Sequence, residues 1–72
     1  MNRFHFDIRD NRDILFDDKG RHCANVLEAM MVAKSALEAL VAEGEVERSL
    51  WIEIADEKGD LVATVRLDEV MN

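Results

Sequence analysis

Apolar residues recur along this chain with two different periods, and the change of period divides it into segments. In the middle they return at steps of four and three, which places them on one side of an α-helix. This stripe consists of Val26, Met30, Ala33, Leu37 and Leu40, and it is widened by Ala29 and Val41. Asn25 is a suitable N-cap with Glu28 at capping-box spacing, and Gly44 is suited to ending a helix. The pattern therefore predicts a helix over Val26–Glu43.

On both sides of this helix, apolar and polar residues alternate as in half-buried β-strands. The predicted strands are Arg3–Arg9, Asp13–Asp17, Ser49–Ala55 and Asp60–Leu67. Turn residues separate them at Asp10–Arg12, Asp17–Gly20 and Asp56–Gly59, and Gly20 and Gly59 supply the positive φ of the last two turns. Glu45–Glu47 is predicted to be an acidic linker, and Asp68–Asn72 is predicted to fray or to add a short helical turn.

A hairpin, a helix and a second hairpin pack most simply as one helix over one face of a sheet. The side chains predicted to face the helix are Phe4, Phe6, Ile8, Ile14, Phe16, Leu50, Ile52, Ile54, Leu61, Val65 and Leu67. We therefore predict a single α+β domain over residues 1–72, with ββαββ order and one helix packed on a four-stranded, largely antiparallel sheet.

Composition and charge narrow the classes of function. Apolar residues make up 49% of the chain, which is too many for a disordered tail. The net charge of −7 disfavours binding to duplex nucleic acid or to an anionic membrane surface, because both require a basic footprint. No apolar run is long enough to span a bilayer, and the N-terminus enters a strand pattern without a secretion signal. We expect a cytoplasmic protein.

The length of the chain raises the question of stability. A domain of 72 residues buries only about 60% of the surface of its unfolded chain. One cysteine allows no internal disulfide, and no metal-ligand spacing is present. Oligomerisation is the remaining source of stability, so we predict a homodimer.

Few residues suggest a catalytic or metal-binding site. His22-Cys23 lacks the further ligands of a metal site, and Cys23 near a helix start is either a reactive thiol or a small buried side chain. The pairs Asp17-Asp18 and Asp56-Glu57 each precede Lys-Gly, so turn formation explains them without acid–base catalysis. We predict no enzymatic activity, no cofactor and no metal.

The sheet face away from the helix is more informative. Its predicted residues are Arg3, His5, Asp7, Arg9, Leu15, Trp51, Glu53, Val62, Thr64 and Arg66. Tryptophan and arginine concentrate binding energy at protein interfaces, which favours a protein contact, most simply with a second copy. The same residue types also suit stacking of single-stranded RNA, although the net charge opposes it. In a third interpretation Trp51 merely shields the sheet by packing over Val62 and Leu15.

Two helix residues, Met31 and Val32, fall outside the apolar stripe. They are either isolated surface residues or part of a second contact surface. The candidate interface residues are Arg3, His5, Arg9, Leu15, Trp51, Val62, Arg66, Met31 and Val32. Our hypothesis is a small acidic interaction module that self-associates or binds another protein. The alternative is binding of single-stranded nucleic acid through the open sheet face, and a thiol-dependent role of Cys23 is a third hypothesis.

The N-terminal strand Arg3–Asp10 with its aromatic residues and histidine, the Asp17–Gly20 and Asp56–Gly59 turns, and the small helix residues Ala29 and Ala33 resemble a known family. It comprises short uncharacterised alphaproteobacterial proteins and is classed as a domain of unknown function. The resemblance covers nearly the whole chain. It implies a small single domain, and it supplies no functional residues.

Overall fold

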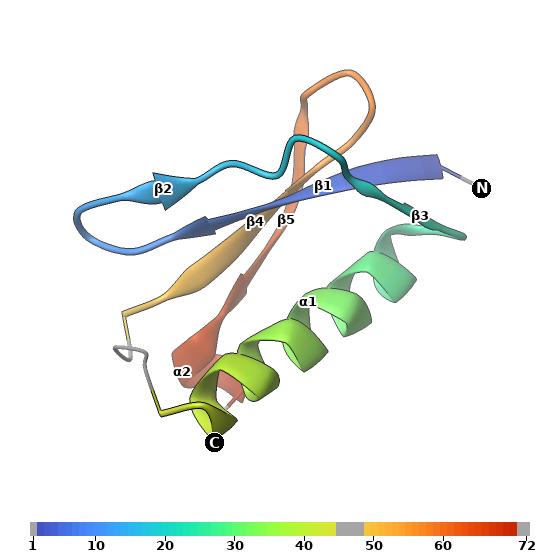
Figure 1. The fold of residues 1–72 in the computed structure, drawn as a ribbon. Helices are drawn as coiled ribbons and strands as arrows, with labels where there is room; N and C mark the ends of the chain where they lie inside the picture. The colour runs from blue at the N-terminus through green and yellow to red at the C-terminus, as the bar shows by residue number, and fades with distance from the viewer. Residues whose placement is uncertain (1, 45–48, 71–72) are drawn as a thin grey trace.

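The computed structural model describes residues 2–44 and 49–70, which form one sheet, one long helix and a short C-terminal helix (Figure 1). The strands and helices, in chain order, are β1 (Asn2–Arg9), β2 (Ile14–Leu15), β3 (Arg21–Cys23), α1 (Val26–Ala42), β4 (Trp51–Ala55), β5 (Leu61–Arg66) and α2 (Leu67–Val70). The predicted α+β class is therefore confirmed. The predicted linker Glu45–Glu47 lies outside the described residues, whereas the helical turn predicted at the C-terminus is present as α2.

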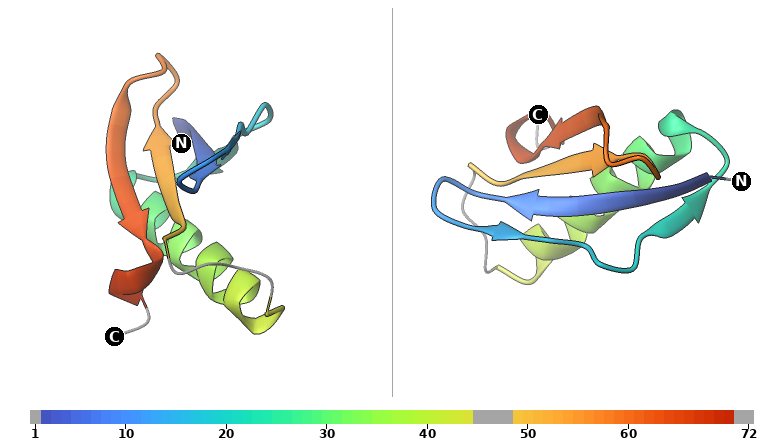
Figure 2. Two further views of the ribbon diagram at one scale, coloured as in Figure 1. Left: turned by 90° about the vertical axis from the view of Figure 1, so that its left-hand side faces the viewer. Right: turned by 90° about the horizontal axis from the view of Figure 1, so that it is seen from above.

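All strand pairs are antiparallel, and the sheet order is β2-β1-β4-β5. A fifth strand, β3, also pairs with β1, on the edge that β2 occupies (Figure 2). The sheet is thus four strands wide, as predicted, but one of its edges is shared by two short strands. No strand was predicted at Arg21–Cys23, because three residues are too few to show an alternation.

The edge formed by β2 and β3 contains an insertion. Arg9 pairs with Ile14 and Ile8 with Leu15, whereas Phe4 pairs with Arg21. Between these two sets of pairs, the three residues 5–7 of β1 face the five residues 16–20 of the neighbouring segment. Two extra residues are accommodated here as a bulged loop.

Helix α1 begins at Val26, as predicted, and ends at Ala42, one residue before the predicted end at Glu43. Asn25 Oδ1 accepts a hydrogen bond from the backbone N–H of Glu28 at 2.9 Å, and Glu28 Oε1 accepts one from Ala24 at 3.1 Å. At the other end Glu43 is the C-cap, and Gly44 has a φ of 75°. The Asn25 side chain thus satisfies one free N–H group of the first turn, and the Glu28 side chain satisfies the N–H of Ala24 just before the helix.

The core lies between α1 and the sheet, with α2 closing one end. Its buried residues are Phe4, Cys23, Ala29, Ala33, Leu37, Ile52, Ile54, Val65 and Leu67. The small residues Ala29 and Ala33 let the helix approach the strands, and Leu37 fills the space beyond them. Each fully buried leucine or isoleucine contributes about 1.5–3 kcal/mol to stability.

The burial of helix residues differs from the prediction in two respects. Val32 was placed outside the apolar stripe, yet it is half-buried and packs against the core. The unpredicted strand β3 runs beside this flank, and Arg21 and Val32 line the same hollow. Conversely, Val26 and Met30 lie on the predicted stripe but remain more than one-third exposed. The buried part of the helix is centred on Ala29, Ala33 and Leu37.

The face assignments on β2 were wrong. Paired residues of antiparallel strands lie on the same face of a sheet. Leu15 pairs with Ile8 and therefore lies on the helix side, whereas Ile14 pairs with Arg9 on the open face. The register follows from a loop closed by a hydrogen bond from Asp10 N to Asp13 O, which the alternation of side chains could not reveal. Phe16, predicted to face the core, is exposed in the following loop.

A β-bulge has the same effect at the start of β5. Ile54 pairs with Ala63, but Ala55 pairs with Leu61, so Val62 is the extra residue. Leu61, predicted to face the core, is exposed beside Ala55 on the open face. Val62, predicted on the open face, lines a hollow together with Phe4 and Val26. The bulge exchanges the two positions because one added residue reverses the alternation.

Candidate interaction surfaces

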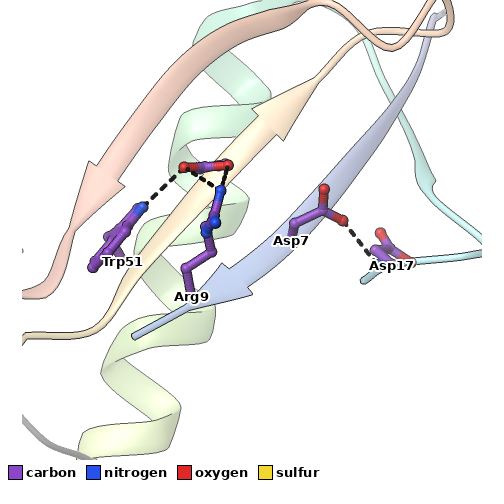
Figure 3. A network of polar contacts seen from close by, with 5 residues as sticks. Asp7, Arg9, Asp17 and Trp51 are labelled. Atoms are coloured by element: carbon purple, nitrogen blue, oxygen red, sulfur yellow. Dashed lines mark hydrogen bonds and ion pairs between the residues drawn. The ribbon is translucent and has the colours of Figure 1, made fainter. Parts of the chain in front are cut away.

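The open sheet face carries a polar network around Trp51. Glu53 Oε2 accepts a hydrogen bond from Trp51 Nε1 at 3.1 Å, and Glu53 Oε1 pairs with Arg9 Nη1 at 3.2 Å (Figure 3). These residues meet because Arg9 is the cross-strand partner of Trp51, and Glu53 lies two residues further along β4 on the same face. The hydrogen bond from Trp51 and, beyond it, the Arg9 guanidinium lower the pKa of Glu53 against the opposing effect of burial. The carboxylate is therefore held ionised between its two donors.

A second network joins β1 to the bulged loop. Asp17 Oδ2 accepts the backbone N–H of Phe6 at 3.0 Å. Asp7 Oδ1 accepts the backbone N–H of Asp17 at 2.9 Å (Figure 3). Asp17 Oδ1 also accepts from the N–H groups of Lys19 and Gly20. Burial raises the pKa of Asp17, but the hydrogen bonds from Gly20, Phe6 and Lys19 outweigh it, so the pKa lies below its usual value. This carboxylate replaces a strand carbonyl at the sheet edge.

Arg3, His5 and Arg66, also predicted on this face, have intramolecular partners as well. Arg3 Nη1 donates to the carbonyl oxygen of Lys19 at 2.8 Å, and Arg3 Nη2 lies 3.3 Å from His22 Nε2. His5 Nδ1 lies 2.8 Å from the carbonyl oxygen of Asp17. Arg66 lies 3.5 Å from Asp68 in an exposed pair. The arginines and the tryptophan are thus oriented by contacts within the domain.

Tryptophan does not pack as the shielding interpretation required. Its cross-strand neighbours are Arg9 and Arg66 rather than Leu15 and Val62, which the register places elsewhere. An open hollow of about 280 Å³ beside Trp51 is lined by Asn11, Thr64 and Arg66. The structure therefore brings together Arg9, Trp51 and Arg66 of the predicted interface and separates Leu15 and Val62 from them.

The outer surface of α1 is more apolar than the open sheet face. Leu27 is 67% exposed and Met31 is 63% exposed, one helical turn apart, and Val26 and Met30 adjoin them. Leu27 and Met31 also line an open hollow of about 650 Å³ along the helix, together with Arg21 and Val32. Met31 was among the predicted interface residues, whereas Leu27 was not. The sequence could have indicated Leu27, because it precedes Met31 by four residues and therefore lies on the same solvent-facing side of the helix.

The candidate thiol is part of the core. Cys23 is fully buried and contacts the cluster that contains Phe4 and Leu37, whereas His22 beside it is exposed. Adjacent strand residues point to opposite faces, so the two side chains cannot act on one ligand. Within residues 2–44 and 49–70, no group of three or more histidine, cysteine or acidic side chains is arranged to hold a metal ion. No helix in the described part of the chain is both long and apolar enough to cross a membrane.

The fold and these surfaces define a small α+β domain with one long helix on an antiparallel sheet. Residues 3–68 match the family described as Domain of unknown function (DUF6894), and the chain belongs to it. The predicted membership of a domain of unknown function is thereby confirmed. No curated protein and no solved structure matches the chain.

Proposed function

We propose that this protein is a non-enzymatic interaction module that self-associates through the outer surface of α1. The observation that carries this proposal is the exposure of Leu27 and Met31, with Val26 and Met30 beside them, on a regular helix. Small monomeric proteins seldom expose large contiguous apolar patches, and apolar residues on one helix face suit docking against a second helix. In a dimer, this apolar helix surface of each copy would be buried against the other copy.

The open sheet face offers less to a partner than the sequence suggested. Glu53 neutralises Arg9 and occupies the indole N–H of Trp51, and Asp68 lies beside Arg66. A partner must replace these contacts before it gains new ones. The alternative of single-stranded nucleic-acid binding through this face receives less support for the same reason, because its arginines are already paired with acidic or carbonyl groups.

The test compares one substitution on each surface by sedimentation velocity over a range of protein concentrations. Met31→Glu places charge in the apolar helix surface and is expected to weaken self-association at least tenfold. Trp51→Ala alters the open sheet face and is expected to leave self-association within threefold of the unchanged protein. Circular dichroism checks that both variants remain folded. A chain that is monomeric at several hundred micromolar would overturn the proposal. If Trp51→Ala abolished self-association and Met31→Glu did not, the contact between the copies would lie on the open sheet face instead.

A further inference from the structure

Strand β5 is the outermost strand at one edge of the sheet, and hydrogen bonds of the domain fix the direction of its backbone groups (Figure 2). Leu67 N donates to the carbonyl oxygen of Leu50 at 3.0 Å, so these two residues form a hydrogen-bonded pair. Such pairs alternate with non-hydrogen-bonded pairs along an antiparallel ladder. Val65 therefore turns its backbone groups toward β4, whereas the N–H groups of Thr64 and Arg66 point away from β4, toward solvent.

A hydrogen bond at the opposite edge agrees with this assignment. In the same alternation, Ile54 turns its backbone groups toward β5, so its partner Phe6 turns its own away from β4. The N–H of Phe6 accordingly donates to Asp17 Oδ2, on the outer side of β1, at 3.0 Å. The two edges of the sheet thus give one consistent pattern of backbone directions.

The two edges are protected to different degrees. β2 and β3 contain two and three residues, and the bulged loop with the Asp17 carboxylate lies between them. β5 contains six residues, Leu61–Arg66, with no lysine or proline, the residues that commonly prevent pairing at a sheet edge. Its bulge lies at the start of the strand. Within residues 2–44 and 49–70, no other strand or loop pairs with the N–H groups of Thr64 and Arg66 or with the carbonyl oxygen of Thr64.

We propose that this edge binds an extended segment of another protein, which adds to the sheet as an antiparallel strand beside β5. Donors and acceptors at strand spacing are complementary to the backbone of a second strand, and main-chain hydrogen bonds then hold the added segment. The partner residue opposite Thr64 exchanges two hydrogen bonds with it. The residue two positions before that one accepts a third from the N–H of Arg66, whose own carbonyl belongs to the first turn of α2.

The helix side of this edge is apolar. Partner residues opposite Val65 and Ala63 lie on the helix side of the extended sheet, because paired residues share a face. Val26 lines a hollow of about 330 Å³ with Val62 at the start of β5, and Met30 follows Val26 by one helical turn. Val26 and Met30 are both more than one-third exposed. These surroundings suit apolar, β-branched side chains in the partner.

The open face of the edge favours an acidic residue in the partner. Arg66 is the one charged residue of β5, and it lies on this face opposite Trp51. Its ion pair with Asp68 is 3.5 Å long and exposed on both sides, so it contributes little. A carboxylate opposite Arg66 forms a cross-strand ion pair, and a threonine suits the position opposite Thr64. From its N-terminus, the preferred segment therefore reads acidic residue, apolar residue, threonine, apolar residue.

The probe is a fluorescein-labelled peptide in which glutamate-valine-threonine-valine is flanked by two serines on each side. Its binding to the full chain is measured by fluorescence anisotropy, with an expected dissociation constant below about 1 mM. N-methylation of the threonine nitrogen removes its hydrogen bond to Thr64 and is expected to weaken binding at least about tenfold. N-methylation of the second valine is the matched control, because that nitrogen points away from β5, and its effect should stay within about threefold.

Variants of the chain test the same edge. Thr64→Pro removes the outward N–H without breaking a hydrogen bond to β4, so the variant should fold and bind the peptide at least about tenfold more weakly. Thr64→Val keeps the backbone groups and should bind within about threefold of the unchanged protein. Circular dichroism checks the fold of both variants. Met31→Glu, on the outer surface of α1, should also bind within about threefold, because strand addition at β5 does not require self-association.

Amide hydrogen exchange on the unchanged chain gives a readout that needs no variant. Without peptide, Thr64 and Arg66 should exchange rapidly and Val65 slowly, and saturating peptide should slow the first two at least about tenfold. Binding that does not saturate up to about 1 mM, or equal effects of the two N-methylations, would overturn the proposal. Protection of Thr64 and Arg66 that grows with protein concentration in the chain alone would assign the edge to a second copy and would equally overturn it. A monomeric chain that binds the peptide would contradict self-association through α1 and support this proposal.

Discussion

Asp17 Oδ2 lies 3.0 Å from the backbone nitrogen of Phe6, so a side chain completes the sheet at a position where no strand residue is available. Asp17 Oδ1 accepts two further N–H groups, those of Lys19 and Gly20. The second turn of the domain uses Asp56 differently. Its Oδ1 accepts from Lys58 and Asp60, and its Oδ2 has no hydrogen bond within the described residues. The two similar sequence segments therefore form similar turns with unequal roles.

This difference gives a matched pair of substitutions. In the unchanged protein, both carboxylate oxygens of Asp17 accept backbone N–H groups. Asp17→Asn replaces one of these oxygens with an NH₂ group, so at least one backbone N–H loses its acceptor and faces another donor. We expect a loss of about 1–2 kcal/mol in the free energy of unfolding. Asp56→Asn can keep its oxygen toward Lys58 and Asp60, so its effect should lie within about 0.5 kcal/mol. Urea unfolding followed by circular dichroism measures both. Equal losses would show that Asp17 has no special role.

The same carboxylate determines part of the acid sensitivity. Its pKa is lower in the folded protein than in the unfolded chain, so ionised Asp17 stabilises the fold at neutral pH. That contribution is fully present above the unfolded pKa of about 4 and is lost as the pH falls through the lower folded value. The stability difference between the unchanged protein and Asp17→Asn should therefore shrink from pH 7 to pH 3. A difference that is constant over this range would contradict the assignment.

Gly20 and Gly59 separate backbone strain from steric contact. Both have positive φ, 71° and 87°, so alanine at either position costs about 1 kcal/mol from its backbone conformation. A Cβ atom on Gly20 would also lie 2.9 Å from the carbonyl oxygen of Phe4, whereas one on Gly59 would meet no atom within 4 Å. We expect Gly20→Ala to destabilise the fold by at least about 1 kcal/mol more than Gly59→Ala. Thermal unfolding at equal protein concentration compares them, and equal effects would argue against the close approach to β1.

Two leucines of α1 test which side of the helix faces the core. Leu37 is fully buried, and Leu27 is largely exposed. Leu37→Ala should cost about 2–5 kcal/mol because it leaves a cavity. Leu27→Ala should change the stability of the monomer by less than about 0.5 kcal/mol while weakening self-association. Unfolding measured at a protein concentration below the dimer dissociation constant isolates the first effect. A large loss of monomer stability in Leu27→Ala would place that side chain in the core.

The burial of Cys23 predicts a thiol without reactivity in the folded state. Iodoacetamide should modify Cys23 at pH 7.5 at least a hundredfold more slowly than it modifies the thiol introduced by Met31→Cys. In 8 M urea the two rates should become similar, because burial rather than thiol chemistry causes the difference. Mass spectrometry of quenched samples measures both rates. Modification of Cys23 in the folded protein at the rate of a free thiol would revive the thiol-dependent hypothesis.

The sequence alone determined the long helix, with its ends to within one residue, and the general succession of strands around it. The helix from Val26, its Asn25 cap, the glycine after it and the α+β class follow from side-chain spacing and from local backbone chemistry. These features depend on residues within a few positions of one another, so the sequence states them directly. The candidate surface was predicted in part, since Met31 was identified and Leu27 was not.

Only the tertiary structure decided the strand register and the exposed faces. The Asp10–Asp13 loop and the bulge at Val62 placed Leu15 and Leu61 on faces that alternation did not predict, and Val32 is half-buried on a flank of the helix beside the unpredicted strand β3. A shift of one residue moves the side chains on one side of it to the opposite face of the sheet, and such a shift depends on hydrogen bonds between distant segments. Whether Trp51 and Arg9 are free or already bound to Glu53 is decided in the same way, by contacts across the sheet.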